Sequence, residues 1–152
     1  MAMDKDDVID TLNELIETCK DGELGFRDCA ENIRDPSIQQ MMMTAGDRCR
    51  QGADELQREV QLLGGKAETS GSLAGSAHRR WVDIKGTIMG KDEASVLAEC
   101  ERGEDVAKES YQRALEQELP ANIRSIVERQ YRGVLENHDR VRALERAAKS
   151  TT

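Results

Sequence analysis

The sequence CKDGE at residues 19–23 recurs as CERGE at residues 100–104, so the chain contains two copies of Cys-x-x-Gly-Glu. Around each copy the apolar residues alternate in steps of three and four. This is the spacing of a helix face that packs inside a bundle. At the same separation along the chain, Ile16 corresponds to Leu97. The repeat therefore predicts two equivalent helices that carry a glycine and a glutamate at the same step.

Four long helices are predicted from this periodicity, with boundaries set by proline, glycine and aspartate. Pro36 ends the first helix, because the residue before a proline is pushed out of helical conformation. Gly64 and Gly65 stop the second, Asp92 caps the third, and Pro120 lies near the start of the fourth. The predicted helices cover residues 4–34, 36–63, 92–118 and 120–148. The expected core residues are Ile16, Phe26, Leu56, Leu97, Tyr111, Val134 and Val141.

Two predicted hairpins, residues 4–64 and 92–148, are joined by a crossover over residues 65–91. Within it, residues 73–89 show the pattern of a short amphipathic helix. Each main helix would be about 40 Å long at ~1.5 Å per residue, and the crossover can traverse that length. This predicts an all-α, single-crossover four-helix bundle, the ferritin-like arrangement, in one domain over residues 1–152. The alternative is an up-down bundle with the short helix lying across one end.

The composition excludes several classes of partner. With 152 residues and a formal net charge of −8, the chain lacks the basic surface that nucleic acids and anionic membranes attract. No apolar run approaches the ~18 residues of a membrane span, and the acidic start MAMDKDDVID contains no apolar signal segment. The four cysteines are too few and too irregularly spaced for a disulfide framework. We therefore expect a cytoplasmic protein with buried, reduced thiols.

Glu23 and Glu104 are the main candidate functional residues, because each lies near the middle of its helix on the stripe that faces inward. Two carboxylates in a dry core repel each other and are costly to desolvate. A shared proton, an arginine, water or a metal ion must therefore compensate. His138, on the inner edge of the fourth helix, could join them. Di-metal carboxylate bundles take one glutamate from each of two helices and a Glu-x-x-His from each of the others.

The Glu-x-x-His part of that pattern is missing. Leu135 stands three residues before His138, and Arg50 occupies the corresponding position of the second helix. A full di-iron site is therefore not expected. Three interpretations stay open: a structural polar layer in which Arg50 or Arg27 pairs with the glutamates, a mononuclear iron or zinc site, and a catalytic acid–base pair. The first is favoured, because an inward glutamate in a bundle commonly pairs with an arginine.

Four segments together resemble an uncharacterised bacterial ferritin-like family, a four-helix-bundle domain of unknown function. The segments are LNELIETCKDGELGFRDCAENIRDP, GSLAGSAHRRWVDIKG, ECERGED and ENHDRVRAL, and the resemblance extends from about residue 6 to residue 144. It implies a ferritin-like bundle in a soluble bacterial protein and no particular activity. The wider ferritin-like group includes iron oxidation and storage proteins and stress proteins. Of their metal ligands, only Glu23, Glu104 and His138 find matches here.

We therefore expect a non-enzymatic, cytoplasmic ferritin-like bundle, with an association with stress suggested by fold-level analogy alone. One rival is a metal-binding protein or oxidase that uses the two glutamates and the histidine to hold iron or zinc. Another is an adaptor that binds a protein partner through an apolar patch of Trp81, Ile84 and Ile88 on the crossover helix. Because the rest of the surface is highly charged, we expect a homodimer rather than a ferritin-like cage.

Overall fold

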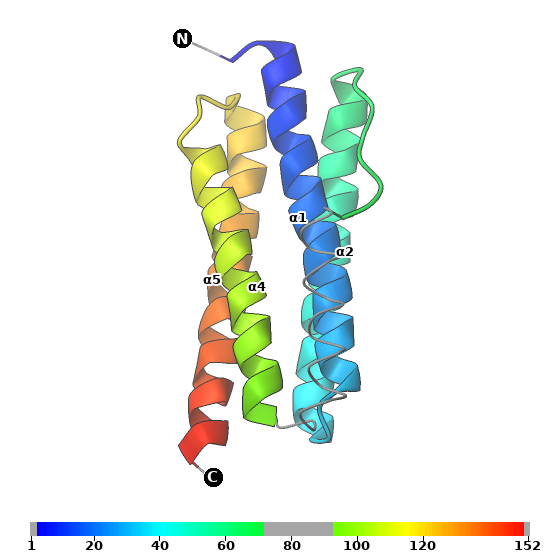
Figure 1. The fold of residues 1–152 in the computed structure, drawn as a ribbon. Helices are drawn as coiled ribbons and strands as arrows, with labels where there is room; N and C mark the ends of the chain where they lie inside the picture. Colours follow the sequence, from blue (N-terminus) through cyan, green and yellow to red (C-terminus); the bar gives the residue numbers. More distant parts are fainter. Residues whose placement is uncertain (1–2, 72–92, 151–152) are drawn as a thin grey trace.

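The computed structural model describes residues 3–71 and 93–150, and four long helices lie in those ranges (Figure 1). They are α1 (Lys5–Glu31), α2 (Pro36–Leu62), α4 (Glu93–Leu115) and α5 (Ala121–Ser150). No strand occurs in the described ranges, and the predicted all-α four-helix bundle is confirmed. The predicted crossover helix at residues 73–89 and its apolar patch lie outside the described residues.

Aspartate caps begin the first two helices. Asp4 Oδ1 accepts a hydrogen bond from the Asp7 backbone N–H at 2.8 Å. Asp35 Oδ1 accepts hydrogen bonds from the Ser37 hydroxyl at 2.8 Å and from the Ser37 N–H at 2.9 Å, and these two bonds lower the pKa of Asp35. Gly64, with a φ of +81°, ends α2 in the left-handed conformation that glycine adopts without strain. The predicted and observed helix ends differ by about three residues or fewer.

Contacts at the two ends of the bundle show where α2 ends and where α4 begins. At one end, the backbone N–H groups of Arg34 and Asp35 both donate to Glu93 Oε1 at 3.2 Å, which places the start of α4 against the α1–α2 turn. At the other end, Gly65 lies in close contact with Ile9, near the start of α1. The chain between α2 and α4 therefore connects opposite ends of the bundle. The end-capping alternative is wrong, and the single-crossover arrangement is the observed one.

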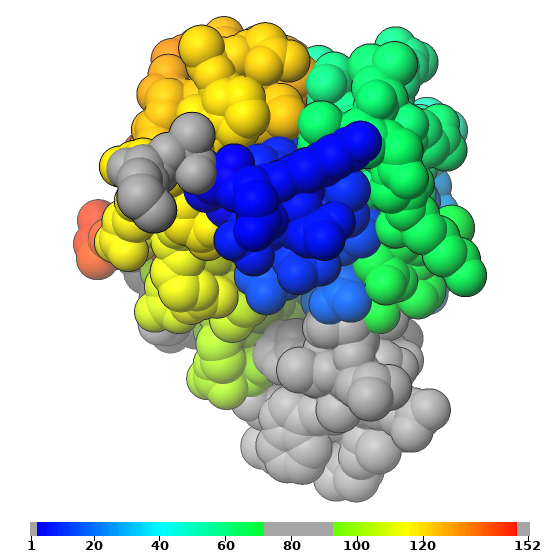
Figure 2. All heavy atoms as spheres, turned by 90° about the horizontal axis from the view of Figure 1, so that it is seen from above, coloured from blue at the N-terminus to red at the C-terminus, as the bar shows by residue number. Residues whose placement is uncertain are grey.

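The segment that follows α2 returns along α1. The Asn13 side chain holds it by donating to the Lys66 carbonyl at 3.0 Å and accepting from the Glu68 N–H at 2.9 Å. Figure 2 views the bundle along its axis and shows the start of α1 between this segment and the α4–α5 turn. Helix α1 therefore contacts α2, α4 and the returning segment, whereas α2 and α5 make few contacts with each other.

Two separate apolar clusters form the core. One lies at the end of the bundle that holds the N-terminus of α1 and includes Leu12, Ile16, Leu56, Val60 and Val127. The other lies toward the α1–α2 turn and includes Phe26, Ile33, Met42, Leu97 and Val141. Every core residue predicted from the sequence is buried except Val134, which is only partly buried. Val134 keeps part of its surface accessible because it lines a cavity between the two clusters.

Candidate functional site

The two Cys-x-x-Gly-Glu motifs meet at the middle of the bundle. Helices α1 and α4 run antiparallel. On one side of the middle of the bundle, Cys19 Sγ lies 3.2 Å from the Tyr111 hydroxyl. On the other side, the Cys29 thiol raises the pKa of Cys100 well above its usual range. The two glutamates of the motif lie between these contacts. The two copies of the motif thus lie at the same level of the bundle, in a layer between the two apolar clusters.

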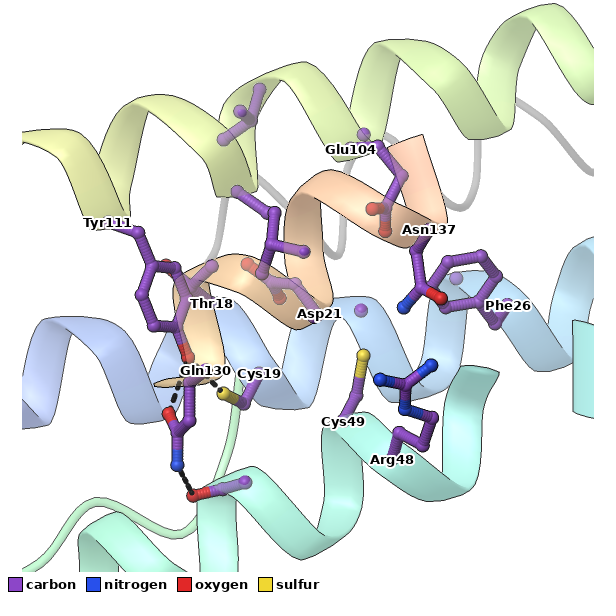
Figure 3. A pocket seen from close by; sticks show the side chains of 18 of the residues that line it. Thr18, Cys19, Asp21, Phe26, Arg48, Cys49, Glu104, Tyr111, Gln130 and Asn137 are labelled. Atoms are coloured by element: carbon purple, nitrogen blue, oxygen red, sulfur yellow. Dashed lines mark hydrogen bonds between the residues drawn. The ribbon is translucent and has the colours of Figure 1, made fainter. Parts of the chain in front are cut away.

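A cavity of about 860 Å³ opens in this layer, and all four helices contribute to its wall (Figure 3). Small residues leave the space: glycines 22, 25, 52, 103 and 133 all line it. The two motif glycines differ in what surrounds them. A Cβ at Gly22 would meet Cys49 Sγ at 2.9 Å, so this glycine makes room for a thiol from α2. A Cβ at Gly103 would meet nothing within 4 Å, because that glycine borders the open space.

Glu104 presents the main polar group of the cavity. Its side chain is 6% exposed, and in Figure 3 its carboxyl points into the space between the helices. Glu104 Oε2 has no hydrogen-bond partner among the described residues. Burial, with a smaller contribution from the charge of Asp105, raises the pKa of Glu104 to about 8. The neutral acid is therefore the main form at neutral pH, and it can both donate and accept a hydrogen bond.

Glu23, the equivalent residue of α1, is buried but paired within its own helix. Arg27 Nη2 lies 3.0 Å from Glu23 Oε2, and Lys20 Nζ lies 3.7 Å from Glu23 Oε1. Arg27 is one of the two arginines that the sequence offered as partners, and Arg50, the other, is exposed on α2. Because Arg27 and Lys20 already compensate its charge, Glu23 can be buried without Glu104 or a metal ion beside it.

His138 is buried, at 6% exposed, and turns toward α4. Its Nε2 lies 2.5 Å from Asp105 Oδ1, and its Nδ1 lies 3.8 Å from Asp139 Oδ1. The neighbouring Asn137 lines the cavity in its place. Within the described ranges, no group of three or more His, Cys, Asp or Glu side chains is arranged to hold a metal ion.

The structure therefore brings Glu23 and Glu104 to the same layer without placing His138 beside them. Both glutamates act on Cys49, whose pKa is raised well above its usual range by burial first, then by Cys19 and the two carboxyls. This layer thus holds an ion-paired Glu23, a neutral Glu104 and the Cys49 thiol.

Comparison with known proteins assigns the chain to a family. Residues 7–117 match the family described as Domain of unknown function (DUF2383). The chain belongs to this family. None of the curated proteins matches it. Among solved structures, a mutant of Dps1 from Mycobacterium smegmatis superposes with a TM-score of 0.76 at 19% sequence identity, covering 93% of this chain and 96% of that one. At that identity the likeness shows a shared ferritin-like fold.

The DUF2383 match covers both motifs and three of the four helices, so the cavity layer falls largely within the family domain. The family description names no activity. None of the helices in the described part of the chain is long and apolar enough to cross a membrane.

A polar network that sequence reasoning missed bounds the cavity of this DUF2383 member on the side of α5. Tyr111 donates to Gln130 Oε1 at 2.8 Å, and Gln130 Nε2 donates to Glu55 Oε1 at 2.8 Å and to the Gly52 carbonyl at 3.3 Å. Together with the Cys19–Tyr111 contact, these bonds link all four helices. The available signal was Gln130 itself, a polar residue on the apolar stripe of the fourth predicted helix.

Proposed function

We propose that the protein is a non-enzymatic, cytoplasmic binding protein whose central cavity holds a small, mainly apolar molecule. Glu104 is the anchor for the polar group of that molecule. The observation that carries this proposal is the unpartnered Oε2 of Glu104, buried in the wall of an 860 Å³ cavity. A pocket of this size whose wall is apolar over most of its area has the usual character of a small-molecule site.

The chemistry of the lining favours binding over catalysis. Burial raises the pKa of Cys19 to about 11, and the pKa values of Cys49 and Cys100 also lie well above their usual range. These thiols are therefore protonated and poor nucleophiles at neutral pH. Glu104, as a neutral acid, suits a hydroxyl, an amide or a basic nitrogen. An amine would take its proton and leave a buried ion pair.

The uncharged dye Nile red tests the cavity. We expect saturable binding to the full chain with a rise in dye fluorescence, because most of the cavity wall is apolar. Ala107 lines the cavity from α4, so Ala107→Leu should reduce binding. Ala143→Leu, at an exposed position of α5, is the matched control and should not. Hexylamine should displace the dye from the wild type better than from Glu104→Gln. Equal dye binding by both leucine variants would sink the proposal.

A divalent metal ion, iron or zinc, held by Glu23, Glu104 and His138 is the second candidate. It is favoured by the two buried carboxyls, which both raise the pKa of Cys49. It requires Arg27 to release Glu23, and Asp105 to release His138. Elemental analysis of protein purified without chelators or a metal-binding tag separates the two candidates. Stoichiometric iron or zinc that disappears in Glu104→Gln would favour the metal.

We also propose that the chain forms a homodimer, and we retain the association with stress on fold-level analogy. The support for a dimer is the charged surface and the net charge of −8, which disfavour the many apolar contacts of a cage. Light scattering should give about twice the chain mass of 17.0 kDa. A mass of many subunits would contradict the dimer.

A further inference from the structure

Three sulfur atoms from three helices converge at one end of the central cavity. Cys100 Sγ of α4 lies 3.9 Å from Met42 Sδ of α2, and Cys29 of α1 belongs to the same buried cluster and raises the pKa of the Cys100 thiol. All three residues are buried, at 7%, 1% and 4% exposed for Cys100, Met42 and Cys29. They belong to the apolar cluster that contains Phe26 and Leu97. Three soft donor atoms therefore belong to one buried apolar cluster.

Access to these sulfurs is through the cavity. Cys29 and Cys100 both line it, whereas Met42 does not and closes the site on the side of α2. Thiolate and thioether ligands select soft ions such as Cu(I), whereas carboxylates and water suit Mg²⁺ and Ca²⁺. Two thiols and one thioether are too few for the four-coordinate site that Zn²⁺ prefers. The donor set therefore suits a soft monovalent cation of low coordination number.

We propose that Cys29, Cys100 and Met42 form a binding site for one Cu(I) ion. Both thiols lose their protons to solvent as two Cu–S bonds form, and Met42 Sδ is a weaker third ligand. The oxidation state of copper and of sulfur does not change. The bound site carries one net negative charge, and Glu104, one turn away on α4, remains neutral at pH 7 and does not oppose it. This site is distinct from the anchor proposed for a small molecule.

An anaerobic titration of the reduced full chain with Cu(I), in competition with the chromophoric chelator bicinchoninate, tests the proposal. We expect binding of one equivalent, release of protons, and an ultraviolet thiolate-to-copper absorption band. Cys29→Ser and Cys100→Ser should lose tight binding and the band. Met42→Leu should weaken binding and keep the band.

Cys19→Ser is the matched control, because Cys19 is a buried cavity-lining thiol that contacts Tyr111 instead of Met42. It should bind Cu(I) as the wild type does. Circular dichroism identifies any variant that fails to fold, and Cys29→Ala and Cys100→Ala then replace it. Wild-type protein should also show a Cu(I)-dependent rise in melting temperature. Equal losses in Cys19→Ser and Cys100→Ser, or no loss in either, would overturn the proposal.

Discussion

Replacing Leu56 with alanine is expected to lower the free energy of unfolding by about 3 kcal/mol. Leu56 is fully buried on α2, in the cluster that contains Leu12 and Ile16. Its truncation removes apolar contacts and leaves a void, because neighbouring helices held by their own packing cannot close the gap completely. Denaturant unfolding followed by circular dichroism at 222 nm measures the change.

Leu62→Ala is the control for this truncation. Leu62 lies at the end of the same helix and is 74% exposed. The same substitution there should change stability by about 0.5 kcal/mol or less. Comparable losses of stability for Leu56→Ala and Leu62→Ala would mean that α2 does not pack through the side that carries Leu56.

Glu104→Gln is expected to make the protein more stable at pH 9 and to flatten the pH dependence of its stability. The pKa of Glu104 is about 8 in the folded chain, against an ordinary value of 4.5 for a solvated glutamate. Between these values the folded protein holds a proton that the unfolded chain has released. The stability of the wild type should therefore fall as the pH rises from about 5 to 8, by on the order of 3 kcal/mol, and then level off.

Glutamine keeps the shape of the side chain and has no charge to bury, so the variant should lack this fall. Urea unfolding of wild type and variant at pH 5, 7 and 9 measures the difference. Glu23→Gln is the matched control, because it removes the equivalent carboxylate, which Arg27 and Lys20 already pair. That variant should change stability modestly and keep the fall with pH. A wild-type stability that is constant between pH 5 and 8 would show that Glu104 is not buried as described.

The sequence by itself determined the helices and the residues that face inward. Local signals are enough for this, because a cap such as Asp35 or a stop such as Gly64 acts on neighbouring backbone groups. The apolar stripe needs only the helical period. For the same reason the repeated motif correctly indicated that Glu23 and Glu104 lie on the inward faces of two equivalent helices, where both are buried.

The partners of those polar side chains were decided only by the tertiary structure. Whether Asn137 or His138 faces the cavity depends on a small rotation of α5, which packing against α4 sets and no local pattern specifies. Glu23 pairs with Arg27 along its own helix, whereas Glu104 has no such neighbour and remains neutral in the cavity. The convergence of Cys29, Met42 and Cys100 likewise joins residues far apart in the chain. Three helices had to pack in one register before their sulfur atoms could meet.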